Sequence, residues 1–248
     1  WRRFLTLQFH DILPGSSIKK VYDDAEKDFL SIQEQTDGLQ QQALRALMVE
    51  EEGLTCVNTL SFERDDILWF DGPEGLCALA DGTGREYPVQ RARGRYCAYV
   101  TGIPALGVKH FQFVAGVPSA ETLPVTTEAF ETPYFAGRFD GKMGIASLVE
   151  RKSGREVAKP GRSLNTLVAY EDKPHNYDAW DINIYYQEKS WPVDDVTSAE
   201  VVENGPVLAV VRVVRRFLSS TIQQDVLFYH DLPHCGNRRC LSCVRISF

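Results

Sequence analysis

The chain has 248 residues, a net charge of −7 and 25% charged side chains, an ordinary composition for a globular protein. This length suits one large domain or two to three small ones. The acidic balance, with no run of Lys and Arg, argues against nucleic acid or an anionic membrane as a partner. No apolar stretch approaches the roughly 18 residues of a membrane-spanning helix, so we expect no membrane partner.

A twelve-residue segment near the start, residues 7–18, reads LQFHDILPGSSI and places His10 beside Asp11, just before a Pro-Gly break. A neutral imidazole can bind zinc, and a carboxylate accepts hydrogen bonds from sugar hydroxyls. The pair therefore indicates a site for a metal and a polyol. A surface salt bridge or a hydrogen-bonded turn would use the same two residues.

Residues 17–51 have the spacing of a long amphipathic helix. Apolar side chains recur every three or four positions along one face, at Ile18, Val21, Tyr22, Ala25, Phe29, Ile32, Leu39, Ala43 and Leu47. We expect Ser16 or Ser17 to be the N-cap and Gly38 to mark a kink. The apolar face predicts one member of a helical bundle, with a coiled-coil dimer as the alternative. Left uncovered, it would favour a homo-oligomer through the exposed helix.

From Leu54 onward the pattern changes to short strands separated by turns. We expect strands over 54–60, 66–70, 76–80, 85–91, 95–101 and 108–115, then 133–139, 144–150, 164–171, 182–189, 196–203, 206–216 and 220–229. Residues 116–127 are rich in Pro, Thr, Ser and Ala and separate two β units. The segment 207–214 is apolar on both faces, which predicts a central strand. There is no βαβ alternation and no glycine-rich phosphate loop, which argues against a nucleotide-binding fold.

These patterns give an α+β, mostly β fold class, in which a long N-terminal helix precedes a small β domain and a larger antiparallel β-sandwich. We expect residues 1–52 to form the helical segment and 53–125 the small β domain. Residues 126–233 would form part of the sandwich, and 234–248 an atypical tail.

A second concentration of chemistry lies at residues 172–181, which read DKPHNYDAWD. Carboxylates beside an indole suit a sugar, because the acids accept hydroxyl hydrogen bonds while the ring packs on the C–H face. The residues with this chemistry are Asp178, Trp180 and Asp181. The alternative is a β-loop in which the tryptophan belongs to the core and the acids cap turns.

The six cysteines fall into two groups. Cys56, Cys77 and Cys97 lie in apolar, strand-like surroundings, which predicts free thiols in a reducing compartment and hence a cytoplasmic location. The second group crowds into the tail beside His234, at Cys235, Cys240 and Cys243. Four N/S ligands are nominally present for zinc, but the spacing matches no usual zinc finger. We expect the tail to be poorly packed, or to extend a sheet edge, without forming a zinc site.

Several segments together resemble the family 38 α-mannosidases. Residues 8–15 match the family's Gln-Phe-His-Asp-Ile-Leu-Pro-Gly segment. Residues 172–181 are similar to its Asp-Xaa-Pro-Xaa-Xaa-Trp-Asp-Ala-Trp-Asp stretch, with Tyr177 where one branch often has Trp. Residues 58–64, 103–107 and 144–157 also resemble family segments. The similarity runs in the family's order from about residue 4 to about residue 233, after which the tail departs from it.

The resemblance implies that the full-length enzyme is a retaining, zinc-dependent hydrolase of terminal α-mannosides. It implies that His10 is one of four zinc ligands, that Asp11 binds mannose hydroxyls, and that Asp178, Trp180 and Asp181 lie at the rim of the substrate site. In the family, the nucleophile, the acid/base and the other three zinc ligands precede the histidine motif. We therefore expect a middle-to-C-terminal fragment with no catalytic residue of its own, which binds no zinc alone and is inactive in isolation.

A different class of function also fits the residues: a non-catalytic β-sandwich module that binds carbohydrate or a protein partner. If the chain instead belongs to an α-mannosidase, as the resemblance implies, the partner of the full-length enzyme is a mannoside or oligosaccharide substrate. An upstream reading frame with a catalytic barrel would favour the enzyme.

Overall fold

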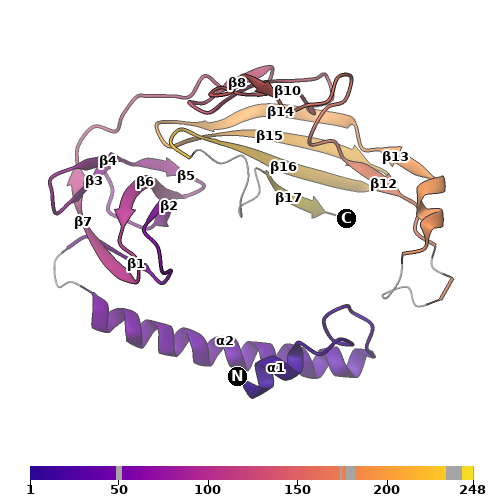
Figure 1. The fold of residues 1–248 in the computed structure, drawn as a ribbon, viewed down its shortest axis with the longest axis horizontal. Helices are drawn as coiled ribbons and strands as arrows, with labels where there is room; N and C mark the ends of the chain where they lie inside the picture. Colours follow the sequence, from indigo (N-terminus) through magenta and orange to yellow (C-terminus); the bar gives the residue numbers. More distant parts are fainter. Residues whose placement is uncertain (49–51, 174, 177–181, 233–241, 248) are drawn as a thin grey trace. The chain divides into compact units, whose positions relative to one another are not determined.

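The computed structural model describes residues 1–48, 52–173, 175–176, 182–232 and 242–247. The expected α+β, mostly β class with antiparallel sheets is confirmed (Figure 1). The chain divides into two compact units. One contains Trp1–Met48 and Val168–Trp191, and the other Val49–Leu167 and Pro192–Phe248. None of the helices in the described ranges has the length and apolar character to cross a membrane.

The predicted long helix is confirmed as α2 (Lys19–Leu47), and a short helix, α1 (Arg2–Leu7), precedes it. The predicted serine N-cap is wrong, because the N-cap is Ile18, which makes no side-chain cap hydrogen bond. The Ser17 N–H instead donates to the Tyr22 hydroxyl at 2.9 Å. Helix α2 runs unbroken through Gly38. Ala25 is the buried residue of this helix, so most of the predicted apolar face is exposed.

The strands up to residue 115 form two sheets. One has the order β1 (Leu54–Asn58), β7 (Gly107–Ala115), β3 (Leu76–Asp81) and β4 (Glu86–Pro88). The other has the order β2 (Arg64–Phe70), β6 (Arg95–Ile103) and β5 (Gln90–Ala92). The expected single strand over 85–91 is wrong: it is divided at Val89, because β4 pairs with β3 while β5 pairs with β6. The core between the sheets includes Leu79, Val100 and Phe111, all fully buried.

The strands from residue 129 onward form a sandwich. One sheet has the order β11 (Arg155–Glu156), β10 (Ile145–Glu150), β9 (Phe135–Phe139) and β8 (Ala129–Glu131). The other has the order β14 (Asp195–Asn204), β15 (Leu208–Phe217), β16 (Ser220–Tyr229) and β17 (Ser242–Ser247). The predicted central strand is confirmed, since β15 pairs on both sides. In the tail, β17 pairs with β16 and extends the sheet, one of the two outcomes expected there.

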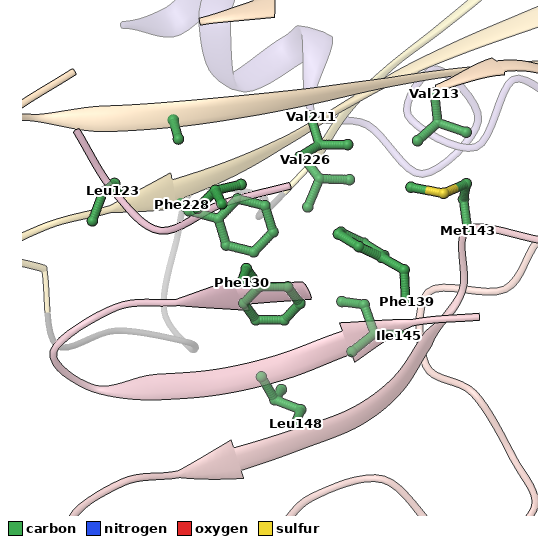
Figure 2. Close-up of a cluster of buried hydrophobic side chains, with 12 residues drawn as sticks. Leu123, Phe130, Phe139, Met143, Ile145, Leu148, Val211, Val213, Val226 and Phe228 are labelled. Carbon is green, nitrogen blue, oxygen red and sulfur yellow. The ribbon is translucent and has the colours of Figure 1, made fainter. Parts of the chain in front are cut away.

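Aromatic rings from both sheets fill the sandwich core. Phe130 lies 4.4 Å from Phe228 and 5.3 Å from Phe139, measured between ring centroids. Figure 2 shows Phe228, Val211 and Val226 pointing toward Phe130 and Phe139 from the facing sheet. Burial of such rings, at about 1.5–3 kcal/mol each, supplies much of the stabilisation of the sandwich.

The expected strand over 182–189 is wrong. Residues Ile184–Glu188 form a 3₁₀ helix, η1, with an i to i−3 hydrogen bond from Tyr186 N–H to Asn183 O at 3.1 Å. The flanking strands β12 (Val168–Tyr170) and β13 (Ser190–Pro192) pair as a two-stranded ribbon. The alternation of residues 182–185, Ile-Asn-Ile-Tyr, suits a strand. However, β12 pairs with β13, so residues 184–188 lie in the connection between these two strands.

A buried glutamine joins the two sheets formed by β1–β7, here called the small β unit, to the sandwich. Gln90 Oε1 accepts hydrogen bonds from the N–H groups of Val207 at 3.0 Å and Leu208 at 2.9 Å. Its Nε2 donates to Leu208 O at 3.0 Å. A Cβ at Gly205 would lie 2.6 Å from Gln90 Cδ, so glycine permits this approach. The Gln90 side-chain amide thus satisfies backbone hydrogen-bonding groups at the start of β15.

An ionic cluster lies at the same junction. Asp225 accepts hydrogen bonds from Arg212 Nε at 2.8 Å, from Arg212 Nη2 at 3.0 Å and from Arg93 Nη2 at 3.2 Å. The Arg93 N–H donates to Glu203 at 2.7 Å. Cys97 is buried beside this cluster, and burial, with the charge of Glu203, raises the pKa of its thiol to about 12. Cys56, Cys77 and Cys97 are all free thiols, as expected.

Candidate functional site

The His10–Asp11 pair lies in a series of turns between α1 and α2. Helix α1 ends at Leu7, which is only 3% exposed. Turn hydrogen bonds follow from Phe9 N–H to Thr6 O at 3.1 Å and from Ile12 N–H to Phe9 O at 2.9 Å. Gly15 then adopts a φ of +83°, a conformation that favours glycine. The Pro-Gly break seen in the sequence thus lets the chain turn into α2.

Both side chains of the pair point to solvent. The exposed fraction of the side chain is 69% for His10 and 51% for Asp11, and Nε2 lies 3.7 Å from Oδ2. The His10 ring packs on the Phe9 ring, with 4.3 Å between centroids. The imidazole is therefore oriented by an aromatic neighbour and a carboxylate, and its donor atoms remain accessible.

Tyr22 fixes the backbone of the pair, a role that the sequence did not reveal. Its hydroxyl donates to Asp11 O at 3.1 Å and accepts from Ser17 N–H at 2.9 Å. The Ser16 hydroxyl adds a weaker contact to Asp11 O at 3.5 Å. Tyr22 falls on the predicted apolar face, which explains why its polar end was missed. The sequence feature that could have indicated this role is a tyrosine on the first turn of α2, close in sequence to the His10–Asp11 pair.

An apolar groove accompanies the turn. It measures about 510 Å³ and runs between the segment holding Leu7 and Leu13 and one side of α2 around Ala25 and Phe29. Phe29 is 41% exposed and Leu13 61% exposed. The polar pair and an exposed apolar surface therefore lie within the same small unit.

The other predicted site residues, Asp178, Trp180 and Asp181, lie outside the described residues, as do His234, Cys235 and Cys240 of the tail.

Two family models match the chain, and both belong to the same group of enzymes. Residues 1–47 match the alpha mannosidase middle domain, and residues 130–236 match the C-terminal domain of glycosyl hydrolases family 38. The chain belongs to glycosyl hydrolase family 38.

Curated family 38 relatives agree with this assignment. Alpha-mannosidase 2C1 of Mus musculus is 28% identical over 204 residues, and that of Homo sapiens is 28% identical over 210 residues. Each match covers 78% of this chain and 18% of the relative. Alpha-mannosidase G of Dictyostelium discoideum is 40% identical over 70 residues, 28% of this chain and 6% of that protein. The chain thus spans less than a fifth of the length of the curated relatives that it matches.

The family 38 resemblance implies zinc bound by four protein ligands, and the described residues fit only a part of such a site. His10 offers an exposed nitrogen, and Asp11 is the carboxylate beside it. Within the described ranges no three His, Cys, Asp or Glu residues gather closely enough to hold a metal ion. Protein zinc sites use three or four ligands, so this pair alone does not make a complete site.

Proposed function

We propose that this chain supplies the middle and C-terminal part of a zinc-dependent, retaining α-mannosidase. In this proposal His10 is one ligand of the catalytic-site zinc, and Asp11 accepts hydrogen bonds from mannose hydroxyls. Asp178, Trp180 and Asp181 are proposed to line the rim of the substrate site. The family assignment and the resemblance of the two motifs to family 38 support these roles.

The observation that carries the proposal is the presentation of adjacent His10 and Asp11 side chains on a backbone held by Tyr22. The hydrogen bond from the Tyr22 hydroxyl to Asp11 O fixes the peptide at 3.1 Å. Both side chains remain exposed. A fixed backbone with free donor atoms is what a ligand set completed by another part of the protein requires.

The same geometry supports inactivity of the chain alone. Retaining glycosidases use two carboxyl groups about 5–5.5 Å apart, one as nucleophile and one as acid/base. Bound zinc would supply Lewis-acid contacts to sugar hydroxyls. Asp11 is a single carboxylate beside a single imidazole. We therefore propose that its task is to hold the sugar while carboxyl groups elsewhere in the complete enzyme react.

A graft tests the proposed roles. This chain replaces the matching segment of mouse alpha-mannosidase 2C1, and zinc content and cleavage of an aryl α-mannoside are measured. We expect the graft to bind zinc and turn over. His10→Ala should lose both zinc and activity, because one ligand is gone. Asp11→Asn should keep zinc and lose turnover about 100-fold or more, in the range of a lost transition-state contact.

Two controls accompany the graft. Arg3→Ala alters an exposed charge of α1 and should leave zinc content and rate unchanged. The isolated chain with added zinc should show no turnover above its His10→Ala variant. Zinc content that His10→Ala does not alter would contradict the ligand role. Turnover by the isolated chain would contradict its inactivity, and an inactive graft that still folds would favour a non-catalytic binding module.

A further inference from the structure

The inner face of the sheet that contains β15 and β16 changes from apolar to polar at one end. Arg215 lies two positions beyond the core residue Val213 on β15, and Gln224 pairs with Val213 from β16. Arg215 is 2% exposed and Gln224 1% exposed. Such residues are rarely buried so completely, since burial is costly unless their polar groups find partners. The pair therefore indicates a task that apolar side chains could not perform.

These two side chains bind each other and two loops of the sandwich. Arg215 Nη1 donates to Gln224 Oε1 at 3.0 Å, and Arg215 Nη2 donates to Lys142 O at 3.1 Å and to Met143 O at 3.2 Å. Gln224 Nε2 donates to Asn165 Oδ1 at 2.8 Å. A guanidinium suits this arrangement, because it presents several donors in a rigid fork. We call Arg215, Gln224 and Asn165 the anchor network.

The first of the two loops is the turn at residues 140–144, between β9 and β10. The Asp140 carboxylate accepts hydrogen bonds from two N–H groups of this turn, at 2.8 and 2.9 Å. Met143 is 6% exposed and belongs to the sandwich core, where Figure 2 shows it at the same end as Val213. The turn that accepts hydrogen bonds from Arg215 is thus fixed by its own contacts and by the core.

The second loop leads into β12. Asn165 lies three residues before this strand and has a φ of +56°, a conformation that asparagine adopts more readily than most residues. Leu164 exchanges two backbone hydrogen bonds with Ile145, at 2.8 and 2.9 Å. The Ser163 hydroxyl donates to the Asp140 carboxylate. The chain entering β12 is therefore bonded to the same turn and to the anchor network.

The chain leaving β13 is also bonded to that turn. Lys142 forms an ion pair with Asp194, which lies two residues after β13. The Val193 N–H donates to Leu167 O at 2.9 Å and so joins the exit to the entrance. Segment 168–191, which contains β12, η1 and β13 (Figure 1), thus leaves and rejoins the sandwich at one hydrogen-bonded base.

We propose that the anchor network positions segment 168–191 for substrate binding. The inference rests on the proposed function, which assigns three residues of this segment to the rim of the substrate site. A buried polar network whose members are all satisfied specifies one arrangement of the parts that it joins. The network itself touches no substrate and takes no part in bond cleavage.

Hydrogen exchange of the whole chain, measured by mass spectrometry, tests the anchor. Asn165→Gly removes the amide that Gln224 binds, while glycine keeps the left-handed backbone. We expect the amides at the base, such as those of Leu164 and Val193, to exchange about fivefold faster, the effect of one lost buried hydrogen bond. The amides of the central strand β15 should keep their rates.

Leu218→Gly is the matched control, since Leu218 also has a positive φ, +53°, and its side chain is 83% exposed. It should leave exchange at the base unchanged. Unchanged rates in Asn165→Gly would overturn the proposal. Equal acceleration in both variants would do so too, as would equal acceleration along β15, because the network would then support the whole sandwich and not the base of the segment.

The graft described above tests the effect on substrate. Asn165→Gly should raise KM for an aryl α-mannoside about fivefold and leave kcat unchanged, because a displaced rim weakens ground-state and transition-state binding alike. A loss of folded enzyme alone would lower the apparent kcat and keep KM. Leu218→Gly should alter neither constant.

The two experiments separate this inference from the proposed function. An active graft in which Asn165→Gly lowers kcat at constant KM, or changes neither constant, would overturn the positioning role alone. A graft without activity would contradict the proposed function, while faster exchange at the base in Asn165→Gly would still support the anchor.

Discussion

Single side chains here often replace backbone partners. Gln90 is the clearest case, since its amide binds two N–H groups and one carbonyl at the start of β15. It is 8% exposed, so the groups that it serves have little access to water. Tyr22 acts similarly on the Asp11 carbonyl. Such contacts fix loops that the sheets themselves do not reach.

Replacing Gln90 should therefore destabilise the junction strongly. Gln90→Ala leaves the N–H groups of Val207 and Leu208 without a partner in a buried place, which costs about 3 kcal/mol. Urea unfolding of the chain measures this loss. Arg91→Ala, at the adjacent exposed position, should change stability by no more than about 0.5 kcal/mol. Similar losses for both variants would contradict the role of the amide.

Asp81 gives the small β unit a dependence on pH. The pKa of this carboxyl lies below its ordinary 3.8, first because the Thr83 hydroxyl donates to it and also because Lys109 and Tyr87 do. Above pH 3.8 the carboxylate stabilises the β3–β4 hairpin, and this contribution is lost as the pH falls toward the lowered pKa. Asp81→Asn should cost about 2 kcal/mol at pH 7.

The pH series supplies the control for Asp81. The stability difference between wild type and Asp81→Asn should shrink steadily in urea unfolding experiments from pH 5 down to pH 2.5. A constant difference over this range would show that the charge of Asp81 is not what stabilises the hairpin.

The sequence predicted part of this chemistry. Adjacent residues such as His10 and Asp11 stand out because their chemistry is local. Gln90 does not, because its partner Leu208 lies 118 residues away and no local pattern links the two. Tyr22 was assigned to the apolar face because its ring fits the spacing and its hydroxyl leaves no periodic signal.

Among the elements, β9 shows how tightly a strand packs between its two neighbours, β8 and β10, in one sheet of the sandwich. A Cβ at Gly137 would lie 2.4 Å from the Phe130 ring and 2.5 Å from Ser147 O. The second contact is with backbone, which cannot move aside without disturbing β10. Glycine thus lets β9 pass between the Phe130 ring and its neighbouring strand.

Gly137→Ala should consequently destabilise the sandwich by about 1–3 kcal/mol, as overpacking does in other cores. Thermal and urea unfolding both measure the effect. Gly141→Ala is the control, since a Cβ there meets nothing within 4 Å and its turn is exposed. A Gly137→Ala variant as stable as Gly141→Ala would mean that β9 is less tightly packed against β8 and β10 than described.

Periodicity predicted most elements and failed where pairing decided the outcome. The 3.6-residue spacing marked α2, alternation marked β6 and β16, and an apolar run on both faces marked β15. Val89 lies where one apparent strand passes from β3 to β6, a change of partner that alternation does not record. Residues 182–185, Ile-Asn-Ile-Tyr, alternate like a strand, yet residues 184–188 form η1 because β12 pairs with β13.

For the molecule as a whole, the exposed face of α2 is the main feature without a covering layer in the described unit. Leu39 is 67% exposed and Leu47 45% exposed. We expect the isolated chain to form a homo-oligomer through this face. Leu39→Glu should weaken association about tenfold by removing apolar contact and adding charge. Sedimentation equilibrium measures the change.

Gln40→Glu is the control for association, because it adds the same charge at the neighbouring exposed position. It should leave the association constant nearly unchanged. If both variants weaken association equally, net charge and not the apolar face controls the oligomer.

The contact of Gln90 with Leu208 also bears on when the small β unit is completed during synthesis. The two residues are 118 positions apart in the chain. At about 5–20 residues per second a ribosome needs roughly 6–24 s to cover that distance. During that interval the Gln90 amide has been synthesised, but its partner Leu208 in β15 has not. A β-hairpin, by contrast, forms within microseconds. The junction is therefore the last part of this region to form, and a pause in translation before residue 207 would prolong its exposure.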